Sequence, residues 1–157
     1  MNREHSYRVQ VRWSGGDGGG TSDQRTYSRD HAVDAGGKPE IAGSADPAFR
    51  GDATRWSPED LLVAALAQCH MLSYLYEAVV AGVVVTQYDD EATGTMVMDG
   101  DGGAHFTKVT LHPVVTVADE AMRERADALH ERAAALCFIG RSVNFPVRHE
   151  ASSRVAG

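Results

Sequence analysis

The chain has 157 residues, a net charge of −7 and two cysteines. We expect residues 1–157 to form a single domain. The acidic balance and the lack of a basic patch argue against nucleic-acid binding, and no consecutive apolar run reaches the roughly 18 residues that span a bilayer. The first residues lack the apolar core of a signal peptide, so we expect a cytoplasmic location, where unpaired thiols stay reduced unless they do redox chemistry.

The N-terminal part predicts two strands and a long connection. Residues 7–13 alternate apolar and polar side chains, which is typical of a half-buried strand. The glycine-rich residues 14–20 predict a hairpin loop, and residues 25–33 predict a second strand. Residues 34–55 show weak periodicity and predict a loop, and loops of that length are often functional.

A long helix follows with clear start signals. Ser57 suits the N-cap, Pro58 suits the first helical position, and Asp60 stands where a capping box needs an acid. The body over residues 59–81 is apolar on nearly all faces. Such a helix is buried, either centrally or against a partner subunit.

The C-terminal part predicts further strands and a second helix. The expected elements are strands at 83–88, 93–98 and 106–117, a helix over 120–136 and a last strand at 145–150. Helices and strands are segregated rather than alternating, so the sequence predicts an α+β fold with antiparallel strands.

The two cysteines are the strongest functional signal. Cys69 lies inside the first predicted helix and Cys137 at the end of the second. A thiol near cations can be a nucleophile, and a second thiol can resolve its oxidised form as a disulfide. Two unrelated buried cysteines fit the spacing equally well, because free cysteine is among the most buried residue types and this spacing matches no metal or redox motif.

Three features together resemble one family. The segment Ser57-Pro58-Glu59-Asp60-Leu61-Leu62, leading to Cys69, is similar to an Asn-Pro-Glu-Glu/Gln-Leu opening with a peroxidatic cysteine ten residues past the glutamate. Cys137-Phe138-Ile139, followed by Ser142, resembles a Cys-Pro-Val/Ile-Ser stretch that carries a resolving cysteine. With the order of elements, these motifs resemble the OsmC/Ohr family, the osmotically inducible and organic hydroperoxide resistance proteins.

The resemblance implies an OsmC-like fold with a long buried central helix, in an intertwined homodimer. It also implies an enzyme that reduces organic hydroperoxides and is reduced by dithiols or lipoylated proteins, with no cofactor and no metal. Cys69 matches the peroxidatic position, Cys137 the resolving position and Glu59 the assisting glutamate. Arg50 is our choice for the assisting arginine, and Arg55 is its competitor. No nucleic acid or membrane partner is expected.

Helix geometry constrains these roles. Glu59 and Cys69 are ten residues apart, so about 15 Å of helix axis and roughly 80° of rotation separate them. One arginine does not easily touch both within a straight helix. The simplest arrangement is a dimer in which Arg50 and Glu59 of one chain meet Cys69 of the other.

Other interpretations remain open from the residues alone. The position of Glu59 also fits a residue that only places a favourable negative charge in the first turn of the helix. The position of Arg50 also fits an ordinary solvent-exposed loop residue. Two departures from the family pattern, His70 after the first cysteine and Phe138 after the second, keep open a non-catalytic domain that binds a small apolar ligand or a partner. A Cys69–His70 dyad or shared metal ion is disfavoured because adjacent helical residues point about 100° apart. A Cys–His hydrolase lacks any matching motif.

Overall fold

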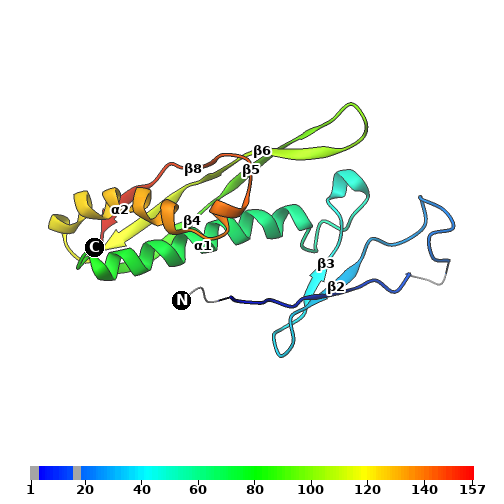
Figure 1. Ribbon diagram of the computed structural model, residues 1–157, viewed down its shortest axis with the longest axis horizontal. Helices are drawn as coiled ribbons and strands as arrows, with labels where there is room; N and C mark the ends of the chain where they lie inside the picture. Colours follow the sequence, from blue (N-terminus) through cyan, green and yellow to red (C-terminus); the bar gives the residue numbers. More distant parts are fainter. Residues whose placement is uncertain (1–3, 16–18) are drawn as a thin grey trace. The chain divides into compact units, whose positions relative to one another are not determined.

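The computed structural model describes residues 4–15 and 19–157 (Figure 1). The chain forms two compact units, Met1–Leu61 and Leu62–Gly157. The first unit carries one three-stranded sheet, and the second carries two three-stranded sheets and the second long helix. The single domain expected over residues 1–157 stays a prediction.

The first unit is built on the antiparallel sheet β1-β2-β3. Its strands are β1 (Gln10–Arg12), β2 (His31–Asp34) and β3 (Ile41–Gly43). The two predicted strands are present but shorter, because Asp23 turns the chain by accepting hydrogen bonds before β2 begins. The predicted loop over residues 34–55 contains β3 and the 3₁₀ helix η1 (Pro47–Phe49), which the weak periodicity did not indicate. Part of the predicted hairpin loop at 14–20 lies outside the described residues.

Ser44 organises the connection between β3 and the first long helix. It is fully buried, and its N–H donates to the carbonyl of Trp56 at 3.0 Å. Its hydroxyl donates to Asp30 Oδ1 at 2.9 Å and accepts from the Asp52 N–H at 3.1 Å. These bonds satisfy the backbone of a segment that would otherwise be a long irregular loop, and they hold Arg50 and its neighbours in one conformation.

Helix α1 (Pro58–Val80) begins as the sequence predicts. The Asp60 N–H donates to Ser57 Oγ at 3.1 Å, and the Ser57 N–H donates back to Asp60 Oδ2 at 3.0 Å, which is a complete capping box. The helix ends before Gly82, whose positive φ of 68° lets the chain leave the last turn.

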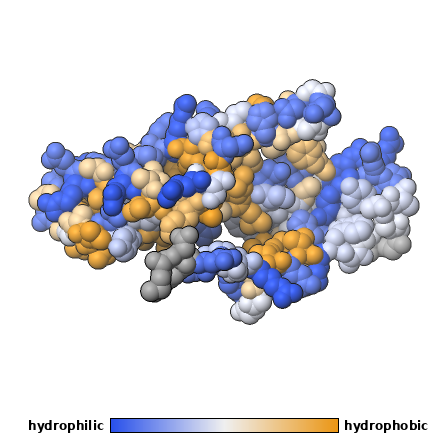
Figure 2. Space-filling model, viewed as in Figure 1, coloured by the Kyte–Doolittle hydropathy of each residue, from blue (hydrophilic) through white to orange (hydrophobic). Residues whose placement is uncertain are grey.

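One face of α1 is buried and the opposite face is exposed. The buried residues recur at helical spacing and are Leu66, His70, Tyr74, Glu77 and Ala78. On the other face Leu72, Tyr76 and Val79 are all more than half exposed, and Figure 2 shows apolar surface over the region where α1 runs. Within the described residues of this single chain, α1 is therefore buried on one face only and not all round as expected. By length and composition α1 would also suffice to cross a membrane, a weak signal that core helices share.

The second unit contains two mixed sheets, ordered β4-β7-β9 and β5-β6-β8. Their strands are β4 (Val85–Asp90), β5 (Thr93–Met98), β6 (Ala104–Leu111), β7 (Pro113–Val117), β8 (Val147–His149) and β9 (Ser152–Val155). β4 pairs with β7 and β5 pairs with β6 in antiparallel fashion, whereas β8 and β9 join in parallel. The predicted α+β fold is confirmed. The single strand expected at 106–117 is two strands in different sheets, divided at His112 before Pro113, which lacks a ladder donor.

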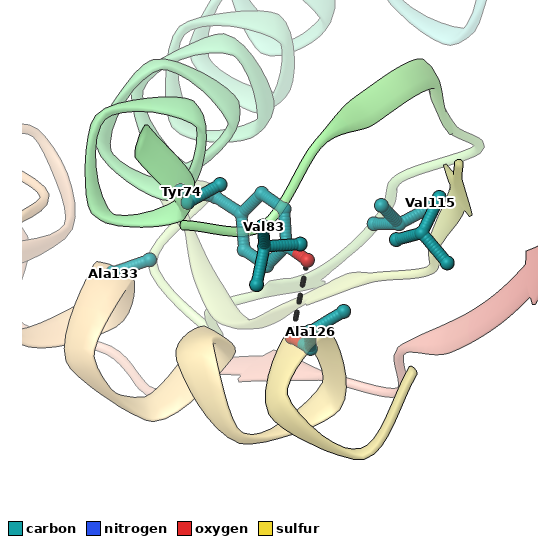
Figure 3. Packing of buried hydrophobic residues seen from close by; sticks show 7 residues of the cluster. Tyr74, Val83, Val115, Ala126 and Ala133 are labelled. Carbon is teal, nitrogen blue, oxygen red and sulfur yellow. Dashed lines mark hydrogen bonds between the residues drawn. The ribbon is translucent and has the colours of Figure 1, made fainter. Parts of the chain in front are cut away.

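Helix α2 (Arg123–Leu136) packs against α1 in the second unit. It follows the 3₁₀ turn η2 (Glu120–Met122), which is capped by Asp119 as predicted. Tyr74 of α1 lies against Ala126 and Ala133 of α2, and its hydroxyl donates to the Ala126 carbonyl at 3.0 Å (Figure 3). The small alanine side chains leave room for the tyrosine ring between the two helices.

Candidate functional site

The second unit places the two cysteine thiols side by side. Cys69 lies in the middle of α1, and Cys137 is the C-cap residue of α2, with extended backbone (φ −68°, ψ 108°). Their side chains are neighbours, and both cysteines are free. The Ile139 N–H, just past α2, donates to Cys69 Sγ at 3.5 Å, and the Gly140 N–H donates to Cys137 Sγ at 3.2 Å. Residues that are distant in sequence therefore form one thiol pair.

The environments of the two thiols differ. Cys137 is 4% exposed, whereas Cys69 is only half-buried. Burial, and then the neighbouring Cys69 side chain, raise the pKa of Cys137 to about 11, while the N–H groups of Gly140 and Ile139 oppose this rise. Cys137 is thus a protonated thiol at neutral pH. Cys69 is the more exposed of the two cysteines.

The other predicted site residues belong to the first unit. Arg50 has a left-handed backbone (φ 67°), the only positive φ at a non-glycine residue in the described chain, and its guanidinium is exposed beside the Gln24 carbonyl at 3.5 Å. Its competitor Arg55 is engaged by Asp30 at 3.3 Å and by Asp52 at 3.6 Å. Their relation to the thiols stays a prediction.

Glu59 lies in the first turn of α1, ten residues before Cys69. The two therefore stand about 15 Å apart along one continuous helix, as expected. One Glu59 carboxylate oxygen is buried and has no hydrogen-bond partner among the described residues. A buried carboxylate oxygen without a donor is costly, so its environment is incomplete in the chain as described.

A buried histidine pair lies beside the thiol pair. His70 and His130 are each 2% exposed, and His70 Nε2 and His130 Nδ1 are 3.0 Å apart. The His70 ring also stacks on His149, and the His130 ring stacks on Tyr74 with centroids 4.3 Å apart. His70 therefore points at α2 and β8, and a Cys69–His70 dyad is not formed.

The pair is held neutral by its surroundings. Burial is the main cause that lowers the pKa of His70 and of His130 to about 4, and the neighbouring histidines add to it. His130 Nε2 is buried and has no partner within the described residues. Among the described residues, no group of three or more His, Cys, Asp or Glu side chains is arranged so that it could hold a metal ion. Sequence reasoning missed His130 and His149 because they lie far from His70 along the chain and no local motif joins them.

The fold and these contacts define an α+β protein in which two helices present a pair of adjacent reduced thiols. A family model described as OsmC-like protein matches residues 51–152. The chain therefore belongs to the OsmC-like family, and the resemblance drawn from its motifs is confirmed.

Solved structures support the same fold. An OsmC-like protein of unknown function from Vibrio cholerae O1 biovar eltor is 29% identical, with a TM-score of 0.85 over 94% of this chain and 99% of that one. An organic hydroperoxide resistance protein from Elizabethkingia anophelis is 15% identical, with a TM-score of 0.69 over 99% and 100% of the two chains. The corresponding protein from Legionella pneumophila is 18% identical, with a TM-score of 0.69 over 97% and 100%. A search of curated proteins found no match.

Proposed function

We propose that this protein is a thiol peroxidase that reduces organic hydroperoxides, with Cys69 as the nucleophile and Cys137 as the resolving thiol. The observation that carries the proposal is the adjacent thiol pair itself. Cys69 Sγ accepts a hydrogen bond from the Ile139 N–H at 3.5 Å. A donor favours the charged form of the sulfur that receives it, and Cys69 is the more exposed of the two cysteines, which supports Cys69 as the nucleophile.

The reaction proceeds in two steps. The Cys69 thiolate attacks the peroxide, an S–O bond forms, the O–O bond breaks, and the alkoxide leaves as an alcohol after taking a proton. Cys137 then loses its proton and attacks the sulfur of the Cys69 sulfenic acid, which forms the disulfide and releases water. A dithiol, free or on a lipoylated protein, reduces the disulfide by exchange. Cys137, at a helix end beside Gly140, is better placed to move than Cys69 within α1.

Arg50 and Glu59 complete the proposed site. A guanidinium near Cys69 would favour the thiolate, and a carboxylate would hold that guanidinium in place. Arg50 is preferred over Arg55 because no ion pair among the described residues involves it, whereas Arg55 already pairs with two carboxylates. The unpartnered buried oxygen of Glu59 supports a role as the acceptor.

The proposal includes a homodimer, since about 15 Å of helix separates Glu59 from Cys69. The exposed stripe of Leu72, Tyr76 and Val79 supplies an apolar face on α1 for a second copy. Static light scattering at micromolar concentration is the test. A dimer mass is expected, and a stable monomer would overturn this part of the proposal.

Steady-state turnover of cumene or tert-butyl hydroperoxide with a dithiol tests the function. Cys69→Ser is expected to abolish peroxide consumption. Cys137→Ser should give one fast turnover and then stall as a sulfenic acid that over-oxidises. His105→Gln, at an exposed position on β6, serves as the control and should keep full activity. Sustained activity of Cys69→Ser, or equal losses in Cys69→Ser and the control, would contradict the assignment.

A second candidate is a non-catalytic ligand-binding role, which a pocket of about 370 Å³ in the first unit favours. Its lining is mostly apolar and includes Trp13 and Tyr27, with the Arg29 guanidinium 3.9 Å from the Tyr27 ring centre. Titration of tryptophan fluorescence with a small aromatic probe tests this alternative. Saturable binding unaffected by Cys69→Ser, with no hydroperoxide turnover, would favour it over the peroxidase.

A further inference from the structure

Two consecutive backbone N–H groups donate hydrogen bonds to the two cysteine sulfurs. The Ile139 N–H donates to Cys69 Sγ at 3.5 Å, and the Gly140 N–H donates to Cys137 Sγ at 3.2 Å. Neither of these N–H groups donates to a backbone carbonyl in the described chain. The sulfurs are therefore the acceptors that these two N–H groups have within the described chain.

The local backbone explains this placement. α2 ends at Leu136, Cys137 is extended, and Ile139 returns to helical angles (φ −69°, ψ −43°), so the chain turns back over the thiol pair. A side chain at position 140 would crowd the sulfur of Cys137. A Cβ added at Gly140 would lie 3.2 Å from Cys137 Sγ and 3.6 Å from Cys137 Cβ. Glycine thus allows the N–H to approach the sulfur closely.

We propose that the Ile139 N–H stabilises negative charge on Cys69 and that the Gly140 N–H stabilises negative charge on Cys137. Each sulfur then has a fixed donor when it is charged, and the Ile139 N–H also lowers the pKa of Cys137. In the first step the charge is on the Cys69 thiolate before it attacks the peroxide oxygen. In the second step it is on the Cys137 thiolate, after loss of a proton to water and before attack on the sulfenic sulfur. The order of these steps rests on the proposed peroxidase function, whereas the donor role does not.

Fixed donors suit this chemistry because they need no reorganisation when charge develops. A backbone N–H also cannot be removed by ordinary side-chain substitution, so side-chain scanning would overlook it. Cys137 is deeply buried, which makes a donor at its sulfur the more necessary when its proton leaves.

The test removes one N–H at a time. Ile139→Pro deletes the donor to Cys69, and the φ of −69° at this position suits proline. Phe138→Pro is the matched control. It introduces the same ring one residue earlier, where Cys137 has the extended ψ of 108° that a following proline requires, and the Phe138 N–H contacts neither sulfur in the described chain.

The readout is the alkylation rate of Cys69 by iodoacetamide at pH 7, resolved by peptide mass mapping and free of any peroxide. We expect Ile139→Pro to slow alkylation about tenfold relative to Phe138→Pro, which is the order of effect of one hydrogen bond to a charged group. Equal rates in the two variants would overturn the proposal for Ile139.

A backbone ester replaces the proline variant if that variant does not fold. Ligation at Cys137 joins residues 1–136 to a synthetic peptide 137–157 in which the Phe138–Ile139 amide is an ester. The ester keeps the Ile139 side chain and loses only its N–H. The same roughly tenfold slowing is expected, and an unchanged rate would overturn the proposal.

Gly140→Ala tests the second donor. The added Cβ should push Sγ of Cys137 away from the N–H, so disulfide closure after one equivalent of cumene hydroperoxide should slow more than Cys69 oxidation does. Equal effects on both steps would overturn the Gly140 part. If wild-type protein consumes no hydroperoxide but loss of the Ile139 N–H still slows alkylation, the peroxidase proposal fails and the donor role stands.

Discussion

Acidification is expected to destabilise this protein through the His70–His130 pair. Both rings are 2% exposed, and the 3.0 Å contact between His70 Nε2 and His130 Nδ1 holds one proton. A first added proton has to go to an outer nitrogen, and His130 Nε2 has no acceptor among the described residues. A second would leave both facing nitrogens protonated and break the contact. The rings stacked on the pair, His149 and Tyr74, supply no compensating negative charge at neutral pH.

The direction in which stability changes with pH follows from which state, folded or unfolded, binds more protons. The folded pKa of each histidine lies at about 4, against 6.5 for an unperturbed histidine. The unfolded chain therefore binds more protons between these values, so stability is fully present above about pH 6.5 and is lost as the pH falls toward 4. Between pH 7 and pH 5 each histidine contributes a loss of about 2 kcal/mol and the pair about 4 kcal/mol, because both stay mostly unprotonated in the folded chain at pH 5. That is a large part of a typical unfolding free energy of roughly 5–15 kcal/mol.

Urea unfolding of the reduced protein at pH 7 and pH 5 measures this loss. The double variant His70→Leu/His130→Leu removes both titrating groups, and His105→Gln removes an exposed histidine as the control. We expect wild type and His105→Gln to lose about 4 kcal/mol more than the double variant over this interval. Equal losses in wild type and the double variant would refute the reasoning.

Three further predictions concern packing. Gly51→Ala should destabilise the first unit severely, because the added Cβ would overlap the carbonyl of Ala45, and thermal unfolding would reveal it; an unchanged midpoint would contradict that packing. Tyr74→Phe should lower the unfolding free energy by about 1 kcal/mol through loss of the bond to the Ala126 carbonyl, measured by urea titration, and no change would mean that the bond is not formed. Leu66→Ala, at a fully buried position, should lower it by roughly 2–5 kcal/mol in the same assay, and a loss below that range would show that the site is not close-packed.

Much of the fold was accessible from local sequence signals. The capping box at Ser57 and Asp60, the long apolar run of α1 and the cap at Asp119 all correspond to features of the structure. Local signals failed where long-range partners decide the structure. β3 and β9 are short and form because a neighbouring strand offers hydrogen-bonding groups, and the break at His112 depends on which sheet each half joins.

The residues of the candidate site also fall into those that the sequence indicated and those that it did not. The family resemblance singled out Cys69 and Cys137, and the structure places their sulfurs together. The histidine pair could not be predicted, because His70 and His130 are sixty positions apart and are joined only by the packing of α1 on α2. The sulfur contacts of Ile139 and Gly140 were equally inaccessible, since a backbone N–H leaves no mark on residue type.

The most direct test of the central claim is the mass of the reduced protein after one equivalent of cumene hydroperoxide. The account predicts a loss of two hydrogen atoms and a peptide pair joined through Cys69 and Cys137. Cys137→Ser should instead gain one oxygen on Cys69, and Cys69→Ser should keep its original mass. An unchanged mass in wild-type protein, or oxygen added to Cys137 while Cys69 stays reduced, would contradict the account.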